Sequence, residues 1–209
     1  MYFNRKCKIT FICHGATIYS EEGRISEAEN YPPLSELGIE EMEFMIKYLK
    51  SRAIKNDVIY TSPAVRTRQS AMMISKLFKK DYVVVDDLTS RRLGQWNGMT
   101  IGQILEKYPE GIEDLLLNPD KNVDSVVEAS GEFVARIKKV IDRLVADNIG
   151  NRIIIVTYPE VIQAAICGAL DIPADKLAKI FIRTGSATQI SYFENWSSLV
   201  YSDHVPLQV

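Results

Sequence analysis

The segment KITFICHGAT, residues 8–17, is a short apolar run that ends on a histidine. Its first six residues are mostly apolar or β-branched and show no helical period, which predicts a buried strand. His14 and Gly15 follow directly, so the strand carries a reactive side chain to a turn. We therefore take His14 as a candidate nucleophile. The alternative is an ordinary strand-end histidine that bonds only to backbone.

Strands and helices alternate along the rest of the chain. Ser35 is a suitable N-cap for a helix whose apolar face carries Met42, Met45, Ile46 and Leu49. This alternation predicts an α/β fold with three layers, α/β/α, around a mainly parallel sheet. We expect one domain over 1–209, with a small cap at about 100–130. The periodicity predicts further strands at 57–62, 82–87 and 152–158, a closing pair of strands at 179–184 and 187–194, and helices at 64–78, 101–108, 130–145 and 160–170.

The composition narrows the classes of function. A net charge of −2 argues against nucleic acid and anionic membrane as partners, and no apolar run reaches the roughly 18 residues of a membrane span. No cleavage site follows the first apolar run, so we expect no signal peptide. The three unclustered cysteines, Cys7, Cys13 and Cys167, indicate reduced thiols and a cytoplasmic protein. With only His14 and His204 as histidines, we expect no metal and no cofactor.

Polar residues follow three of the predicted strands. His14 ends the first, Ser62-Pro63 ends the second and leads to Arg66, and Tyr158-Pro159-Glu160 ends a third. In open α/β sheets, ligands bind beyond the carboxyl ends of the strands. A histidine, an arginine and a helix N-terminus at one crevice predict an anion site, most simply for phosphate. The plainer interpretation of Arg66 is a salt-bridged helix residue.

Six motifs in order resemble the histidine phosphatase superfamily, in the branch of the phosphoglycerate mutases and α-ribazole phosphatases. Each motif alone is weak, but together they cover about residues 8–194. The resemblance implies a phosphoglycerate mutase-like fold. The motifs are Cys13-His14-Gly15-Ala16-Thr17 with Ser20 and Gly23-Arg24, Leu34-Ser35-Glu36-Leu37-Gly38, the segment from Thr61 to Ala71, the segment from Leu88 to Gly98, Gly131-Glu132, and the segment from Val156 to Ile162.

The mechanism that this resemblance implies uses five side chains. A histidine attacks phosphorus, two arginines and a second histidine bind the phosphoryl oxygens, and a glutamate protonates the leaving oxygen. His14 and Arg66 match two of these positions. Cys13 replaces the first arginine, Ser90 the glutamate and Tyr158 the second histidine. The expected substrate-binding set beside His14 and Arg66 is therefore Cys13, Thr17, Ser20, Arg24, Ser90 and Tyr158, with Ser20 in place of the family's loop asparagine.

Three substitutions among five positions predict a pocket with little turnover, and leave open whether the protein is an enzyme. Losing one preorganised donor costs about 100- to 1000-fold, and losing a general acid costs about 100- to 10,000-fold, although such factors do not multiply. The first hypothesis is therefore a pseudo-phosphatase that binds phosphate or a small phosphoester, with strongly impaired or absent phosphomonoesterase activity. On this hypothesis Cys13 and Tyr158 are mainly fillers.

A second hypothesis is an active phosphomonoesterase that forms phosphohistidine at His14. Glu160 lies two residues after Tyr158, which is the spacing of the acid in phytase-like relatives, so it could be a relocated acid. The plainer interpretation of Glu160 is a first-turn carboxylate of a helix. Arg91 and Arg92 could likewise supply the missing charge, or form a solvated basic pair.

A third hypothesis is a non-catalytic protein-interaction module that keeps the fold without its ligand. The partners that we expect overall are phosphate or a small phosphorylated molecule. A homodimer could form through the strand at 179–184 or another exposed sheet edge.

Overall fold

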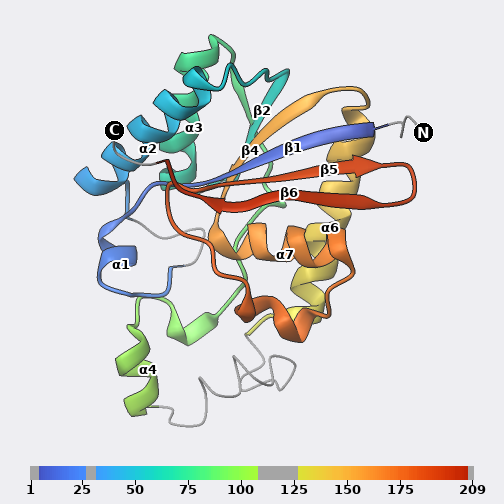
Figure 1. The fold of residues 1–209 in the computed structure, drawn as a ribbon. Coiled ribbons are helices and arrows are strands. Elements are labelled where there is room, and N and C mark those ends of the chain that lie inside the picture. Colours follow the sequence, from blue (N-terminus) through green and yellow to red (C-terminus); the bar gives the residue numbers. More distant parts are fainter. Residues whose placement is uncertain (1–4, 27–31, 108–126, 207–209) are drawn as a thin grey trace.

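The computed structural model describes residues 5–26, 32–107 and 127–206, in which helices cover both faces of a central sheet (Figure 1). The described strands form one sheet in the order β3-β2-β4-β1-β5-β6. The first four strands along the chain pair in parallel, whereas β5 and β6 are antiparallel, so the sheet is mainly parallel, as predicted. The strands are β1 (Arg5–Cys13), β2 (Val58–Thr61), β3 (Tyr82–Val84), β4 (Arg152–Thr157), β5 (Ala187–Phe193) and β6 (Ser197–His204).

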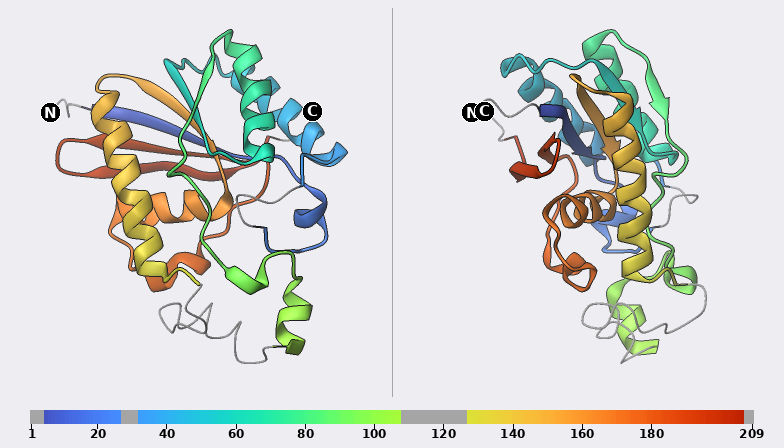
Figure 2. Two further views of the ribbon diagram at one scale, coloured as in Figure 1. Left: turned by 180° about the vertical axis from the view of Figure 1, so that it is seen from behind. Right: turned by 90° about the vertical axis from the view of Figure 1, so that its right-hand side faces the viewer.

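Two helices pack on each face of the sheet, which confirms the three predicted layers. The central strand β4 shows why, because Ile153 and Ile155 enter one core cluster while Ile154 and Val156 enter the other. A strand buried on both faces needs such a continuous apolar run. Helices α2 (Glu36–Ser51) and α3 (Val65–Phe78) cover one face, and α6 (Ser130–Asp147) and α7 (Pro159–Leu170) cover the other. Figure 2 shows the molecule from behind and from the side, with α6 lying along its face of the sheet. The short helices are α1 (Ile18–Glu21), α4 (Ile101–Lys107) and the 3-10 helices η1 (Gly94–Trp96) and η2 (Ala174–Lys179).

The loop after β1 packs directly on the first turn of α2. A Cβ atom on Gly15 would lie 2.2 Å from the carbonyl oxygen of Gly38, and one on Gly38 would lie 2.0 Å from that of Ala16. The hydroxyl of Ser35 accepts a hydrogen bond from the amide of Gly38 at 3.2 Å, which confirms the predicted N-cap. Glycine is thus required at both contact points, and the loop is fixed against a helix.

The prediction of a strand at 179–184 is wrong. Phe181 is 74% exposed and Ile182 is buried, so the side chains alternate as they do in a strand. The amide of Arg183, however, donates to the carboxylate of Asp203 at 2.7 Å instead of pairing with a neighbouring strand. β5 lies between β1 and β6, and β6 is one edge of the described sheet.

Most of the cap predicted at about 100–130 lies outside the described residues. The described parts of that range are α4 and the segment that leads into α6. In the described part of the chain, no helix is both long and apolar enough to cross a membrane.

Candidate active site

A cleft of about 260 Å³ lies at the carboxyl ends of the parallel strands. The strands β1, β2 and β4 end here, and the antiparallel strand β5 begins here. Eight of the nine predicted site residues line it; the ninth, Cys13, does not. The lining residues are His14, Thr17, Ser20, Arg24, Ile25, Ser26, Arg66, Ser90, Leu93, Tyr158, Pro159, Glu160 and Thr184.

Backbone hydrogen bonds fix His14 at the floor of the cleft. Its amide donates to the carbonyl of Thr157 at 3.0 Å, and its carbonyl accepts from the amide of Gly185 at 3.0 Å. The ring Nδ1 lies 2.7 Å from the carbonyl oxygen of Gly15, and since a carbonyl can only accept, Nδ1 carries the proton and Nε2 keeps its lone pair. Burial, and then the charge of Arg66, lower the pKa of His14 from 6.5 to about 3. At neutral pH the ring is therefore uncharged, as a nucleophile must be.

Arg66 supplies positive charge next to that nitrogen. It is the second residue of α3 and only 2% exposed. Its Nε donates to Nε2 of His14 at 3.3 Å, and its Nη2 donates to the carbonyl of Ser26 at 3.2 Å. Burial lowers the pKa of Arg66, but a guanidinium stays charged at physiological pH. A phosphoryl group that enters between the two side chains would replace the contact of Nε with His14.

Tyr158 forms an aromatic wall over these two residues. Its ring centroid lies 4.8 Å from Cζ of Arg66, in cation–π geometry, and 6.0 Å from the His14 ring, edge to face. Tyr158 is 2% exposed. Burial raises the pKa of Tyr158, although Arg66, the Ala64 backbone and the Thr67 side chain act in the opposite direction. The side chain is therefore neutral, and it fills the position where the resemblance implies a histidine.

Glu160 reaches the part of the wall where the resemblance implies the acid. Its Oε2 accepts a long hydrogen bond of 3.4 Å from the amide of Arg91, the residue after Ser90. Burial raises the pKa of Glu160, while Arg91 and Arg66 act in the opposite direction. The cleft thus holds a histidine whose pKa is lowered and a carboxyl whose pKa is raised. Environments that push two pKa values apart in this way favour a base or nucleophile paired with an acid.

The loop residues Thr17, Ser20 and Arg24 line the cleft, but their polar groups also hold the loop together. Thr17 and Ser20 form a capping box at α1, in which the Thr17 hydroxyl accepts from the Ser20 amide at 3.2 Å and the Ser20 hydroxyl accepts from the Thr17 amide at 2.8 Å. The Ser20 hydroxyl also donates to the Thr17 carbonyl at 2.8 Å. Arg24 pairs with Glu22 and donates to the carbonyl of Gly98 at 2.9 Å. A ligand contact by any of the three would have to compete with these bonds.

Cys13 requires a correction, because its side chain has no exposed surface and belongs to the core. Burial raises the pKa of its thiol well above the ordinary value, so it is not a thiolate either. The proposed replacements for the missing arginine also lie elsewhere. Arg91 is 5% exposed and donates from Nε to the carbonyl of Glu128 at 2.6 Å, and Arg92 faces Glu128 at 3.9 Å. Neither arginine lines the cleft.

Thr184 is a lining residue that the sequence did not reveal. Its hydroxyl donates to Glu41 at 2.9 Å, and the same carboxylate accepts from the amide of Ala16 at 2.7 Å. Glu41 therefore ties the loop after His14 to the segment before β5.

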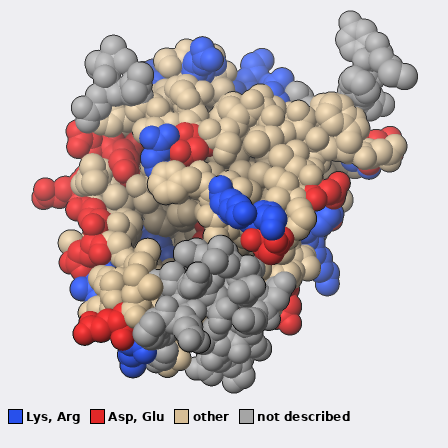
Figure 3. Space-filling model, turned by 60° about the horizontal axis from the view of Figure 1, so that its bottom comes forward, with Lys and Arg blue, Asp and Glu red and all other residues tan. Residues whose placement is uncertain are grey.

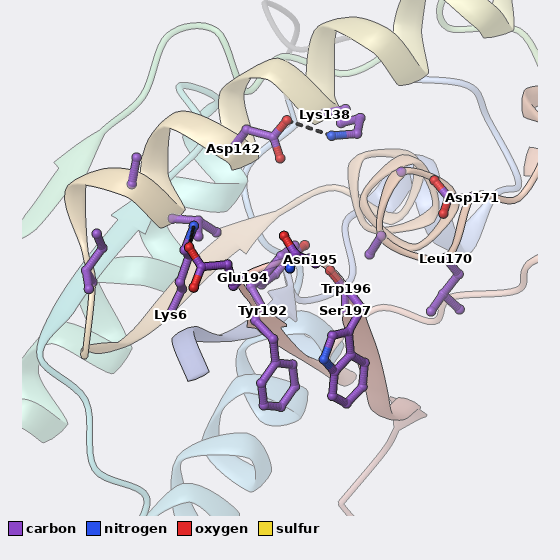
Figure 4. A pocket seen from close by; sticks show the side chains of 16 residues that line it. Lys6, Lys138, Asp142, Leu170, Asp171, Tyr192, Glu194, Asn195, Trp196 and Ser197 are labelled. Atoms are coloured by element: carbon purple, nitrogen blue, oxygen red, sulfur yellow. Dashed lines mark hydrogen bonds and ion pairs between the residues drawn. The ribbon is translucent and has the colours of Figure 1, made fainter. Parts of the chain in front are cut away.

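A larger cavity, of about 660 Å³, lies at the opposite end of strands β1 and β5 from the cleft (Figure 4). The turn between β5 and β6 and the last turns of α6 and α7 line it. Its two lysines are paired, Lys6 with Glu194 at 3.7 Å and Lys138 with Asp142 at 2.7 Å. Neither histidine nor arginine is among its lining residues. Size alone therefore does not identify the chemical site.

Possible metal ligands and the distribution of surface charge were the next features of the described residues. Among the described residues, no group of three or more His, Cys, Asp or Glu side chains could hold a metal ion. On the described part of the face that is turned forward in Figure 3, basic and acidic side chains are interspersed.

Comparisons with known proteins give similarity along nearly the whole chain. The family model that matches, over residues 9–203, is that of the histidine phosphatase superfamily (branch 1). Phosphoserine phosphatase 1 of Hydrogenobacter thermophilus is 24% identical over 169 residues, which are 81% of this chain and 79% of that protein. The bifunctional protein Rv2228c of Mycobacterium tuberculosis is 25% identical over 197 residues, which are 92% of this chain and 52% of that protein. The chain thus spans about half the length of this relative.

The solved structure of the α-ribazole phosphatase from Shigella flexneri superposes with a TM-score of 0.82. The match covers 97% of this chain and 98% of that chain, at 18% sequence identity. At this identity the likeness concerns the fold alone, and it agrees with the predicted three-layer architecture.

Proposed function

The chain belongs to the histidine phosphatase superfamily, and we propose that it binds phosphate or a small phosphomonoester between His14 and Arg66, with a strongly reduced rate of hydrolysis. One observation carries the proposal: the neutral Nε2 of His14 lies 3.3 Å from Nε of Arg66 at the wall of the cleft. A nucleophile beside a phosphoryl-binding cation is the core of a phosphoryl-transfer site. The name of the phosphoserine phosphatase relative supports a small phosphomonoester as ligand.

The reduced rate follows from the charge around the phosphoryl oxygens. Phosphoryl transfer depends on positioning and on positive charge at these oxygens. The cleft offers the guanidinium of Arg66, whereas Cys13 is buried in the core and Tyr158 is neutral. Each missing donor costs about 100- to 1000-fold. Binding needs fewer of these groups than turnover, so we expect affinity for phosphate to outlast most of the catalysis.

An active phosphomonoesterase is the second candidate, because Glu160 lines the same cleft as His14 and carries a carboxyl that could protonate a leaving oxygen. Nε2 of His14 would form a bond to phosphorus while the bond from phosphorus to the ester oxygen breaks, and Glu160 would give its proton to that oxygen. Water would then attack the phosphohistidine, release phosphate and return a proton to the Glu160 carboxylate. The raised pKa of Glu160 supports the acid role, because it increases the protonated fraction near neutral pH.

The test is hydrolysis of an aryl phosphate from pH 5 to pH 8 by the wild type, His14→Ala and Glu160→Gln. We expect slow turnover that His14→Ala abolishes. If Glu160 is the acid, turnover falls as pH rises through its pKa, and Glu160→Gln removes both the activity and this limb of the profile. Glu132→Gln is the matched control, since Glu132 is the first-turn carboxylate of α6 and does not line the cleft.

Binding is measured separately, by isothermal titration with inorganic phosphate. Binding without any turnover would support the pseudo-phosphatase and exclude the active enzyme. Absence of both would leave the protein-interaction module, against which the open cleft beside Tyr158 already argues.

The oligomeric state and the cellular location are two further proposals. The edges of the described sheet are β3 and β6, and a homodimer would use one of them, which light scattering can test. The three cysteines are buried, and we propose a cytoplasmic protein with reduced thiols.

A further inference from the structure

A second ionic cluster lies behind the wall of the cleft that carries Ser90. Arg136 of α6 donates from Nε and Nη2 to the two carboxylate oxygens of Glu128, at 2.9 and 3.0 Å. The same guanidinium donates to the carbonyls of Asp87 at 2.9 Å, Thr89 at 3.4 Å and Ser90 at 3.2 Å, and to the Thr89 hydroxyl at 3.1 Å. All three of its nitrogens are therefore engaged. We call Arg136 and Glu128 the clamp.

Glu128 holds the other end of the same segment. Its side chain is 2% exposed, and its carboxylate also accepts from the amide of Arg92 at 3.3 Å. Its backbone amide donates to the carbonyl of Arg92 at 2.9 Å, and its carbonyl accepts from Nε of Arg91 at 2.6 Å. Burial raises the pKa of Glu128, but the bonds from Arg136 and Arg92 bring it below the ordinary value, so the carboxylate is charged. Segment 87–92 is thus held by both members of the clamp.

Segment 87–92 carries the groups that meet Glu160. Ser90 lines the cleft, and the amide of Arg91 donates to Oε2 of Glu160. We propose that Arg136 and Glu128 are positioning residues, which hold Ser90 and Arg91 at the cleft wall and thereby place the carboxyl of Glu160. The inference rests on the proposed function, because it concerns the acid of the same cleft. Neither residue of the clamp lines the cleft, so neither is catalytic.

The geometry argues for positioning more than for stability. A buried ion pair contributes little net stability compared with apolar residues of the same volume. A forked guanidinium with fixed donors, however, specifies where each of its acceptors lies. A lysine at position 136 would keep the charge but could not reach the carboxylate and three carbonyls together.

The test measures the pKa of Glu160 by NMR in protein labelled with carboxyl-13C glutamate, with Glu160→Gln to identify the signal. The charged groups that act on Glu160 are Arg91, Arg66 and Glu128. In Arg136→Lys the charge stays, while the segment loosens and the Arg91 amide withdraws from the carboxylate. We expect the pKa of Glu160 to rise by about 0.5 to 1, which corresponds to the loss of one hydrogen bond.

Two variants control this result. Arg143→Lys is the matched control, because Arg143 lies on the same helix but is exposed and pairs with the side chain of Asp87 at 3.1 Å; it should leave the pKa of Glu160 unchanged. Thr89→Val removes one contact of Arg136 and keeps the ion pair. It should produce a smaller rise in the same direction, and it replaces Arg136→Lys if that variant does not fold.

If Arg136→Lys folds and the pKa of Glu160 is unchanged in it, the inference is overturned. If only Thr89→Val folds, an unchanged pKa of Glu160 in that variant overturns it. Titration with inorganic phosphate separates this outcome from a failure of the proposed function. Because the clamp lies outside the cleft, Arg136→Lys should keep the Kd for phosphate within about twofold. A tenfold loss of affinity with an unchanged pKa also counts against the inference. If the wild type binds no phosphate, the proposed function fails, while the pKa still tests the clamp.

Discussion

The two walls of the cleft differ in what they keep of a phosphatase site. On one wall, His14 and Arg66 are in contact, nearly buried, and match the nucleophile and phosphate-binding positions that the family resemblance implies. On the other wall, Ser90 and Tyr158 stand in place of an acid and a histidine, and Glu160 approaches from a helix start. On the proposed function, this difference separates binding from turnover. We expect the first wall to hold a phosphoryl group and the second to determine whether the ester bond breaks.

We call the wall with His14 and Arg66 the retained wall, and the wall with Ser90 and Tyr158 the substituted wall. Restoring the family residues on the substituted wall should have the largest effect, and this effect is on the rate of hydrolysis. In Ser90→Glu with Tyr158→His, a general acid worth about 100- to 10,000-fold and a phosphoryl donor worth about 100- to 1000-fold return together. Since these factors do not multiply, we expect kcat/KM for an aryl phosphate to rise by at least about 100-fold. The new carboxyl would lie near Glu160, and two neighbouring carboxyls raise each other's pKa, which favours the acid form. Steady-state hydrolysis measures the gain.

The same double change in a His14→Ala background is the control, and it should gain nothing. If the double variant folds, keeps His14 and shows no increase in rate, the proposed difference between the two walls is contradicted. It would mean that the retained wall is not a competent nucleophile site, and that the missing groups are not what limits turnover.

A pH dependence of stability tests whether the retained wall really holds a neutral nucleophile. The pKa of His14 is lowered from 6.5 to about 3, so the unfolded chain binds the proton more strongly than the folded protein between these values. The free energy of unfolding therefore rises with pH across this window. Between pH 4 and pH 6.5, at 1.36 kcal/mol for each pH unit, His14 should account for about 3 kcal/mol.

Urea unfolding from pH 4 to pH 7 measures this contribution. His14→Gln should flatten the dependence by that amount. Equal pH dependence in the wild type and His14→Gln would show that the ring takes up protons as readily folded as unfolded. The retained wall would then lack a buried neutral histidine.

The regular elements of this fold were predictable because their patterns are local. β4 is a continuous apolar run, and α2 begins at a serine that caps it. The incorrect strand at 179–184 has the same in–out alternation as a true strand. What decides its state is the carboxylate of Asp203, 20 residues away, which binds the amide that a strand would use. No local pattern contains that contact.

The candidate site was predictable to the extent that motifs mark strand ends. His14 and Arg66 follow from such motifs, and they do lie together in the cleft. Cys13 lies with Phe11 in the core, as a period of two along β1 predicts, which fits its interpretation as a filler and not its place in the substrate-binding set. The contact of Glu160 with Arg91 joins residues 69 positions apart, so only the fold reveals it.

Removing the cation from the retained wall should weaken binding by an intermediate amount. A hydrogen bond to a charged group contributes about 1.5 to 3 kcal/mol, so Arg66→Met should raise the Kd for inorganic phosphate by about 10- to 100-fold. Arg24→Met is the matched control, since Arg24 lines the same cleft but is engaged by Glu22 and the Gly98 carbonyl. Its Kd should change by less than about threefold. Similar losses in both variants would mean that the charge of the whole cleft, and not Arg66 in particular, holds the ligand.

The smallest effect is expected from Tyr158→Phe, which asks whether the substituted wall takes part in binding at all. The hydroxyl is buried and faces the Ala64 backbone and the Thr67 side chain, so its removal should change the free energy of unfolding by no more than about 1 kcal/mol. The Kd for phosphate should stay within about twofold, because a filler contributes shape and no hydrogen bond. A loss of fivefold or more would show that the hydroxyl turns toward the bound phosphate and donates to it. Tyr158 would then replace one function of the missing histidine, and the division between a binding wall and a catalytic wall would fail at this residue.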